Sequence, residues 1–189
     1  MSELVHNPAT TAYDLDKYLA FELNGASYSI SISIVREIME YIEVDKIPMA
    51  PDFIIGAINL RGLVIPVFDL SVRLNKPAQP NTNRTCIIVA ECNYKAQNIT
   101  VGLKVDMVTK VLDIPAQEID QVPSIAGQFH SRFVYGLAKL TDSLMTILDI
   151  TKILTLDDVQ LFDDLQQHNK QLALELTLDS DPAHSYEER

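Results

Sequence analysis

The chain has 189 residues, 47% of them hydrophobic and 22% charged, which is typical of a globular protein of one or two domains. Only two cysteines are present, which excludes a disulfide-stabilised scaffold and fits a reducing compartment. The longest strongly apolar stretch, residues 53–60, is too short to cross a bilayer, and residues 1–16 have no secretory signal pattern. We therefore expect a cytoplasmic protein with no direct membrane insertion.

The net charge of −11 lies mainly at the two ends of the chain. Residues 1–16 carry a net charge of −3 and residues 155–189 a net charge of −7, whereas residues 17–154 carry −1. A nucleic-acid-binding protein needs a basic surface, and this sequence has none. We interpret residues 1–16 as a flexible segment and residues 155–189 as an acidic, partly helical extension, and the simplest role of both is solvation.

The first predicted elements are two strands, residues 17–24 and 27–33. They flank Asn24-Gly25, and an Asn-Gly pair between alternating segments strongly indicates a β-hairpin. After them, Ile34, Ile38 and Ile42 lie four residues apart, which predicts a short helix over residues 34–42.

Residues 57–70 are predicted to form two strands separated near Arg61-Gly62, with Pro66 favouring an edge position or a bulge for the second strand. Residues 75–83 form a polar linker containing two prolines. Further strands are predicted over residues 85–92 and 98–105, a segment with a bend over 105–114, a long polar connection over 115–132, and final strands over 134–140 and 143–150.

The C-terminal extension differs from this all-β series. Leu156, Val159, Phe162 and Leu165 are spaced as in a helix, so we expect a helix over residues 155–170. Leucines alternate over residues 171–178 in a segment whose composition otherwise favours helix, so this segment is ambiguous.

An internal repeat relates residues 53–74 to residues 133–154 without a gap, at an offset of 80. The identical pairs are Phe53/Phe133, Gly56/Gly136, Leu60/Leu140, Asp69/Asp149 and Leu74/Leu154. A weaker similarity at an offset of 69 relates residues 22–37 to 91–106. We therefore predict two similar halves, about 17–75 and 84–154.

The two copies of the repeat differ at one turn. Arg61-Gly62 in the first copy corresponds to Thr141-Asp142 in the second, so the turn itself does not require arginine. Arg61 is then either the partner of a local surface ion pair or a contact residue for another protein.

Four segments together resemble the CheW-like chemotaxis coupling domain over residues 17–154. They are KYLAFELNGASYSISISIVREI, FIIGAINLRGLVIPVFDL, ITVGLKVDMV and YGLAKLTDSLMTILDI. The most specific element is Asn59-Leu60-Arg61-Gly62 followed by Val64-Ile65-Pro66-Val67 and Asp69-Leu70. The resemblance does not extend to the C-terminal extension.

The resemblance implies an all-β fold with short helices, built as two pseudo-symmetric five-stranded SH3-like barrels, with no catalytic activity and no cofactor. It implies an adaptor between the cytoplasmic tip of methyl-accepting chemoreceptors and the regulatory domain of the histidine kinase CheA. By motif matching, the receptor-binding residues would be Arg61, Glu37, Val35, Gly102, Val108 and Val111. The kinase-binding residues would be Gly56, Asn59 and Gly62.

Each of these assignments has a structural alternative. The three valines are of a type often buried in cores, and the glycines are often kept for their backbone conformation. For Arg61 we hypothesise an ion pair with Glu37 in the free protein, which is exchanged or shared when a receptor binds.

The sequence gives no support for catalytic, metal or nucleotide chemistry. The four histidines are scattered, and neither the HExxH and CxxC spacings of metal sites nor a Gly-rich phosphate-binding motif is present. Cys86 and Cys92 lie too far apart along one predicted strand to form a disulfide. Two alternatives to the chemotaxis adaptor stay open, namely a similar adaptor of another pathway such as surface motility, and a small β-barrel enzyme or ligand-binding protein.

The leucines of residues 171–178 suggest that the extension docks on the folded body or on a second chain, because an exposed apolar row favours aggregation. Deletion of residues 155–189 should then lower either the melting temperature or the molar mass measured in solution. If both quantities stay unchanged, the leucines have no such role.

Overall fold

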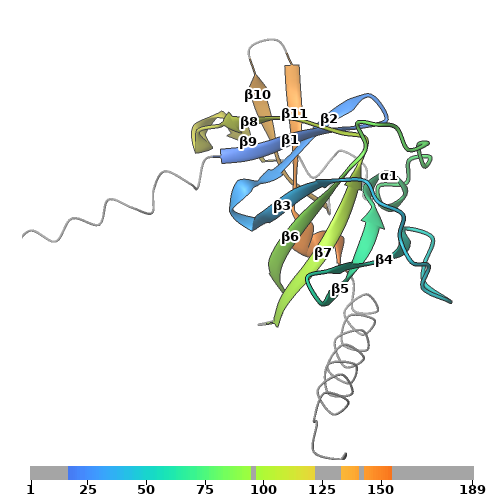
Figure 1. The fold of residues 1–189 in the computed structure, drawn as a ribbon. Helices are drawn as coiled ribbons and strands as arrows, with labels where there is room; N and C mark the ends of the chain where they lie inside the picture. Colours follow the sequence, from blue (N-terminus) through green and yellow to red (C-terminus); the bar gives the residue numbers. More distant parts are fainter. Residues whose placement is uncertain (1–16, 95–96, 122–132, 141–142, 155–189) are drawn as a thin grey trace, which may run out of the picture.

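The computed structural model describes residues 17–94, 97–121, 133–140 and 143–154. In these ranges the chain is mostly β with a few short helices, as the sequence predicted. It forms two mixed sheets of six and five strands, where the resemblance implied two barrels of five strands each. In Figure 1 the six-stranded sheet lies above the five-stranded sheet, and the two pack against each other. The predictions for residues 1–16, the Thr141-Asp142 turn, and the segments 155–170 and 171–178 lie outside the described residues.

The six-stranded sheet, named sheet A, has the strand order β8-β1-β2-β11-β10-β9. All neighbours are antiparallel except β2 and β11, which are parallel. Its strands are β1 (Lys17–Leu23), β2 (Ala26–Ser31), β8 (Met107–Asp113), β9 (Ile119–Asp120), β10 (Val134–Leu140) and β11 (Ser143–Leu148).

The five-stranded sheet, named sheet B, has the strand order β3-β6-β7-β5-β4. Its strands β5 and β7 pair in parallel. The strands of sheet B are β3 (Val35–Glu40), β4 (Ile54–Leu60), β5 (Leu63–Asp69), β6 (Cys86–Tyr94) and β7 (Gln97–Val105). The α-helices of the described ranges are α1 (Leu70–Arg73) and α2 (Ile150–Ile153), and two 3₁₀ helices are η1 (Ile32–Ile34) and η2 (Ala116–Glu118).

The two sheets repeat one strand order. Replacing β3, β6, β7, β5 and β4 by β8, β1, β2, β11 and β10 converts the order of sheet B into that of sheet A. We call residues at matching register positions repeat partners. The sheets do not coincide with the sequence halves, because β1 and β2 join strands of the second half while β6 and β7 join strands of the first.

The two sheets differ in strand number at the outer edge of β4 or β10. In sheet A, β9 pairs with β10 through Leu137 and Ala138, whereas in sheet B an isolated bridge joins Asp45 to Ala57. A Cβ on Gly56 would lie 2.4 Å from the carbonyl oxygen of Asp45, and a Cβ on Gly136 would lie 2.5 Å from Ile119 Cγ2. Both glycines therefore allow an outer segment to approach the strand closely.

The helix predicted over residues 34–42 is wrong. The chain forms the 3₁₀ helix η1 and then the strand β3. The side chain of Ser31, the residue before η1, accepts a hydrogen bond from Ser33 N–H. A register shift between Val35 and Glu37 interrupts the regular pairing of β3 with β6. The isoleucines four residues apart do not form the buried face of a helix, since Ile38 and Ile42 are both exposed. Pairing with β6 overrides the local pattern.

Of the two alternatives predicted from Pro66, the edge position is wrong, because β5 lies between β4 and β7. The other alternative, a bulge, is found in the partner strand, where the register shifts between Ile54 and Gly56. Pro66 is opposite Ala57, and the parallel pairing with β7 begins one residue later, at Val67. The missing N–H of proline therefore falls before the parallel ladder. The other predicted strands are confirmed in the described ranges, and Asp106 forms the predicted bend between β7 and β8.

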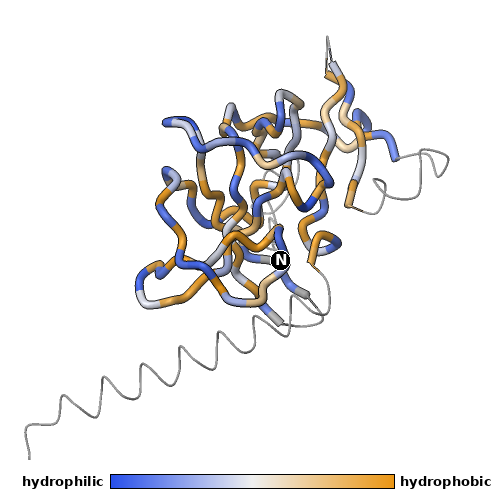
Figure 2. Tube along the Cα trace, turned by 90° about the vertical axis from the view of Figure 1, so that its right-hand side faces the viewer, coloured by the Kyte–Doolittle hydropathy of each residue, from blue (hydrophilic) through white to orange (hydrophobic). Residues whose placement is uncertain are grey.

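The core has a shared part and two separate parts. The largest cluster combines side chains of both sheets, including Phe21, Phe68 and Leu103, all at most 1% exposed. Each sheet also has a smaller cluster, and the members Ile147 and Val67 of these clusters are repeat partners. Figure 2 shows the hydrophobic stretches inside the body and hydrophilic stretches at its periphery.

Arg73 joins the two copies of the repeat at their contact. Its guanidinium carbon lies 4.4 Å from the ring centroid of Phe53 and 5.1 Å from that of Phe133, two residues related by the offset of 80. Its Nε donates a hydrogen bond of 2.9 Å to the carbonyl oxygen of Ile153, the residue that replaces arginine in the second copy. One arginine therefore serves both copies, where two arginines at symmetric positions would repel each other.

Candidate functional site

The tip of the β4–β5 hairpin presents Arg61. Arg61 and Gly62 have φ angles of 54° and 88°, the left-handed values that a two-residue type I′ turn requires. The side-chain oxygen of Asn59 accepts a hydrogen bond of 2.9 Å from Gly62 N–H. Asn59 and Gly62, both expected at a kinase contact, thus have a direct role in shaping the turn that carries Arg61.

The predicted ion pair between Arg61 and Glu37 is confirmed. An Nη of Arg61 lies 2.8 Å from Glu37 Oε2, and the two side chains are 80% and 30% exposed. Glu37 belongs to β3, at one end of the strand order of sheet B, while Arg61 belongs to the β4–β5 hairpin at the opposite end of that order. A pair this exposed contributes about 0–1 kcal/mol to stability, so it leaves Arg61 available to another partner.

The three predicted valines lie on the two edge strands β3 and β8. Val35 and Val108 are repeat partners, and each is partly buried against the shared core. Val111 on β8 is 51% exposed, and its repeat partner on β3, Ile38, is 44% exposed. Ile38 was not predicted at this surface, because its spacing in the sequence placed it on a helix.

An ion pair of 2.6 Å between Arg36 Nε and Glu91 Oε2 also lies on β3 and β6. The hydrogen bond from Arg36 to Glu91, and then the charge of Glu91, raise the pKa of Arg36 above the ordinary value. A guanidinium group is charged at any physiological pH, so the β3 edge combines an exposed apolar side chain with charged neighbours.

The remaining predicted glycines lie in the interior. Gly102 is buried in β7, where an added Cβ would lie 3.0 Å from Ile87 Cγ2 and 3.1 Å from Val67 Cγ2. Gly56 is buried against Asp45. The structure therefore brings together Arg61, Glu37, Asn59 and Gly62, places Val111 on the other sheet, and gives Gly56 and Gly102 packing positions.

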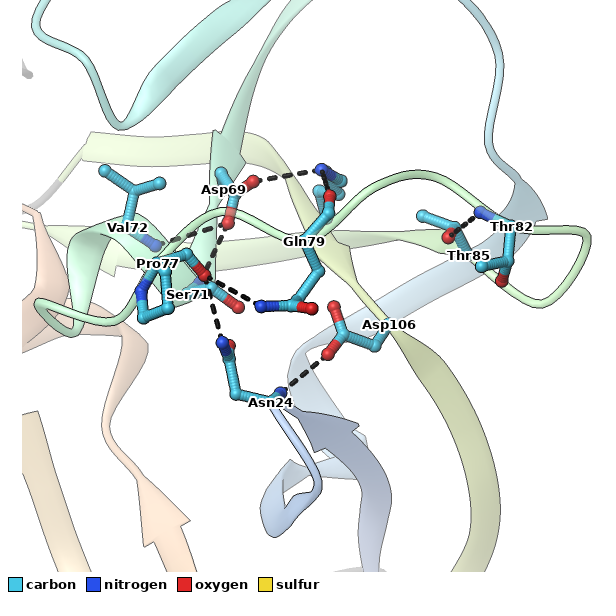
Figure 3. A network of polar contacts seen from close by, with 10 residues as sticks. Asn24, Asp69, Ser71, Val72, Pro77, Gln79, Thr82, Thr85 and Asp106 are labelled. Carbon is cyan, nitrogen blue, oxygen red and sulfur yellow. Dashed lines mark hydrogen bonds and ion pairs between the residues drawn. The ribbon is translucent and has the colours of Figure 1, made fainter.

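A buried polar network was not predicted from the sequence. Lys104 Nζ lies 3.0 Å from Asp69 Oδ2, and the two side chains are only 9% and 4% exposed. The other carboxylate oxygen of Asp69 accepts hydrogen bonds from the N–H groups of Ser71 and Val72 at the start of α1 (Figure 3). The identity of Asp69 and Asp149 in the repeat was the signal that could have indicated this capping role.

The same network holds the linker of residues 75–83 against the body. Asn24 donates from its side chain to the carbonyl oxygen of Pro77 at 3.0 Å and from its backbone N–H to Asp106 Oδ2 at 2.6 Å (Figure 3). Lys104 Nζ donates to the carbonyl oxygen of Gln79 at 3.2 Å. The polar linker is therefore bonded to both sheets.

Within the described ranges, no three His, Cys, Asp or Glu side chains gather in a way that could hold a metal ion. The α-helices of the same ranges have four residues each, too few to span a bilayer. What the described surface offers is contact chemistry, namely an exposed arginine, a carboxylate beside it, and apolar side chains on two sheet edges.

Comparison with known proteins identifies the family of this chain. A family model described as "CheW-like domain" matches residues 17–158. "Chemotaxis protein CheW" of Klebsiella aerogenes is 32% identical over 149 residues, which cover 79% of this chain and 87% of that protein. "Chemotaxis protein CheW" of Bacillus subtilis is 31% identical over 145 residues, covering 77% of this chain and 90% of that protein.

A solved structure gives the same result for the fold. The crystal structure of the scaffolding protein TtCheW from Thermoanaerobacter tengcongensis superposes with a TM-score of 0.67 and 31% identity, covering 76% of this chain and 94% of that one. The chain therefore belongs to the CheW-like domain family and is a non-enzymatic scaffolding protein of chemotaxis.

Proposed function

We propose that this protein couples the cytoplasmic tip of methyl-accepting chemoreceptors to the regulatory domain of the histidine kinase CheA. It would do so in the cytoplasm, at receptor arrays on the membrane. Arg61 at the tip of the β4–β5 hairpin is the observation that carries the proposal, since its position serves contact better than it serves folding.

The backbone of Arg61 supports this interpretation. A left-handed conformation costs an ordinary L-residue about 1–2 kcal/mol, whereas asparagine adopts it more readily. The β1–β2 hairpin has asparagine at the corresponding turn position, where Asn24 has a φ of 51°. Strain kept at an exposed charged residue is typical of functional positions. Arg61 can offer a planar fork of donors to a carboxylate or a carbonyl group of a receptor helix.

The receptor surface in this proposal extends from Arg61 and Glu37 to the apolar edges of β3 and β8. Val35, Val108 and Val111 lie on these edges, and the exposure of Val111 supports a direct contact. Gly102, which is buried, would act through the packing of the strands beneath the surface. For the kinase we propose the loops around the β4–β5 hairpin, with Asn59 and Gly62 at the surface and Gly56 acting through the backbone.

We also infer that each sheet forms one of two SH3-like barrels related by a pseudo-twofold axis. The common strand order, the separate core cluster of each sheet and the single Arg73 at the contact of the two copies support this arrangement. Two related domains in one chain would let an adaptor meet two partners at once.

Replacement of Arg61 by asparagine tests the proposal. Arg61→Asn should leave the free energy of unfolding unchanged or raise it by up to about 1 kcal/mol, because the turn relaxes while a weak ion pair is lost. The affinity for a receptor signalling fragment should fall by roughly 1–4 kcal/mol, the range for an interface anchor. Urea unfolding measures the first quantity and co-sedimentation with the receptor fragment and CheA the second.

Lys139→Asn is the matched control. Lys139 lies on β10 and also forms an exposed ion pair, 2.7 Å from Asp120. This variant should leave receptor binding unchanged. If Arg61→Asn unfolds the protein, or binds receptor as tightly as the unmodified chain, Arg61 is not the receptor contact.

A further inference from the structure

The parallel strand pairs place one lysine and one serine at equivalent positions. In sheet B, Lys104 on β7 is paired with Asp69 on β5. In sheet A, Ser29 on β2 is paired with Ile147 on β11. Because the two strands are parallel, continuing this register by two residues places Ser31 beside Asp149. Ser31 is therefore the repeat partner of Lys104, and Asp149 is the repeat partner of Asp69.

In sheet B the lysine fills this position. The Lys104 ammonium lies 3.0 Å from Asp69 Oδ2 and 3.2 Å from the carbonyl oxygen of Gln79, and 5.9 Å from the ring centroid of Tyr41. Only 9% of its side chain is exposed. Its ammonium group therefore has a carboxylate, a carbonyl oxygen and an aromatic ring as neighbours.

In sheet A the same position is an open groove of about 300 Å³. Its walls are mostly apolar, and Ser31 and Asp149 lie along them. The apolar side chains are Tyr18, Ile34, Tyr135, Ile147, Leu148 and Ile150. The serine is too short to fill the space that a lysine fills in the other sheet, so the groove keeps the carboxylate of the lysine site, Asp149, without the lysine.

Asp149 lines the groove, and both of its carboxylate oxygens have partners within the chain. One oxygen accepts from the backbone N–H of Thr151 at 3.0 Å and from its hydroxyl at 2.5 Å, as expected at the start of α2. The other oxygen lies 3.2 Å from Lys152 Nζ, whose side chain is 53% exposed. That ion pair is solvent-screened and easily exchanged, unlike the buried pair of Lys104.

We propose that this groove binds a lysine side chain of a partner protein, in the position that Lys104 occupies in sheet B. The apolar walls suit the four-carbon stem, and Asp149 suits the ammonium group. The volume lies at the lower end for ligand pockets, which fits one side chain better than a whole metabolite. The chain's own residues 155–189, with nine acidic and two basic residues, are disfavoured as the occupant beside a carboxylate.

This lysine site goes beyond the coupling function and does not depend on it, and a small probe tests it on the full chain. N-acetyl-lysine N-methylamide should shift the backbone amide signals of Ser31 and Thr151 in a saturable way. N-acetyl-norleucine N-methylamide, which has a similar stem but no charge, should bind at least about tenfold more weakly, because an ion-assisted hydrogen bond is missing. Equal binding of both probes, or of neither, overturns the proposal.

A third probe separates the source of the amine. If n-butylamine binds while the capped lysine does not, the groove accepts free amines and not the side chain of a protein, and the proposal is wrong. If both bind, the groove accepts an ammonium on a peptide-linked stem, as proposed.

Two variants test the groove itself. Ser31→Lys should fill it from within, raise the melting temperature and abolish binding of the capped lysine, while Ser31→Ala, which loses the same hydroxyl without filling the space, should retain binding. Asp149→Asn should weaken binding at least about tenfold. If the capped lysine binds Ser31→Lys or Asp149→Asn as well as the unmodified chain, it binds elsewhere. Receptor and kinase binding play no part in these measurements, so their outcome is independent of the coupling proposal.

Discussion

Replacing Asp69 by alanine should lower the free energy of unfolding by about 3–5 kcal/mol, because it leaves the Lys104 ammonium buried without its counter-charge. The two groups are 3.0 Å apart and almost fully buried, and Asp69 also caps α1 through Ser71 and Val72. Urea unfolding at neutral pH, compared at equal m-values, measures the change.

The repeat offers a matched control for this variant. Asp149 caps α2 in the same way but faces an exposed lysine, so Asp149→Ala should cost only about 1 kcal/mol, the usual value for a lost cap. The double variant Asp69→Ala/Lys104→Met should be more stable than Asp69→Ala alone, because it removes the unpaired charge. If Asp69→Ala and Asp149→Ala destabilise the protein equally, the buried pair contributes nothing beyond the cap.

Replacing Gly56 by alanine is expected to destabilise the fold by about 3 kcal/mol, because overpacking and a strained backbone conformation add together. The φ angle of Gly56 is 153°, and an added Cβ would lie 2.4 Å from the carbonyl oxygen of Asp45 and 2.9 Å from Val44 Cγ2. The segment bridged to β4 would have to move away, which breaks the two backbone hydrogen bonds between Asp45 and Ala57. Thermal and urea unfolding both report the loss.

Gly62→Ala is the control for Gly56→Ala. Gly62 also has a positive φ, 88°, but an added Cβ would meet no atom within 4 Å, so this change should cost only about 1 kcal/mol. The comparison also separates two roles of Gly56. A Gly56→Ala protein that stays stable yet loses kinase binding would make this residue a direct contact and contradict its role in packing.

The common strand order of the two sheets allows the positions at which repeat partners carry different residues to be compared. Lys104 is matched by Ser31, and Arg73 by Ile153. Because these pairs occupy equivalent backbone positions in the two copies but carry different side chains, the backbone fold alone does not require either side chain. At Arg73 the reason for the difference is packing across the contact of the two copies, whereas at Ser31 the difference opens a groove.

The sequence was most informative where structure is local. Asn24-Gly25 predicted the first hairpin because few residues adopt the left-handed conformation of its turn, and the break at Arg61-Gly62 was placed correctly between two strands. The ion pair of Arg61 with Glu37 also followed from matching motifs and is present. The isoleucines of residues 34–42 misled, because a period of four along an interrupted edge strand resembles a helix.

Most strands, the hairpins, the repeat and the family of this chain could be predicted from the sequence. Their signals are the alternation of polar and apolar residues, the residue types of the turns and the order of the motifs, all of which can be read directly along the chain. The sharing of strands between the sheets, the interior positions of Gly56 and Gly102, and the burial of Lys104 on Asp69 became visible in three dimensions alone. These features depend on parallel pairings such as β5 with β7 and β2 with β11, whose strands are far apart in the chain. Such pairings are formed by backbone N–H and C=O groups, which nearly every residue has, so no local sequence pattern predicts them.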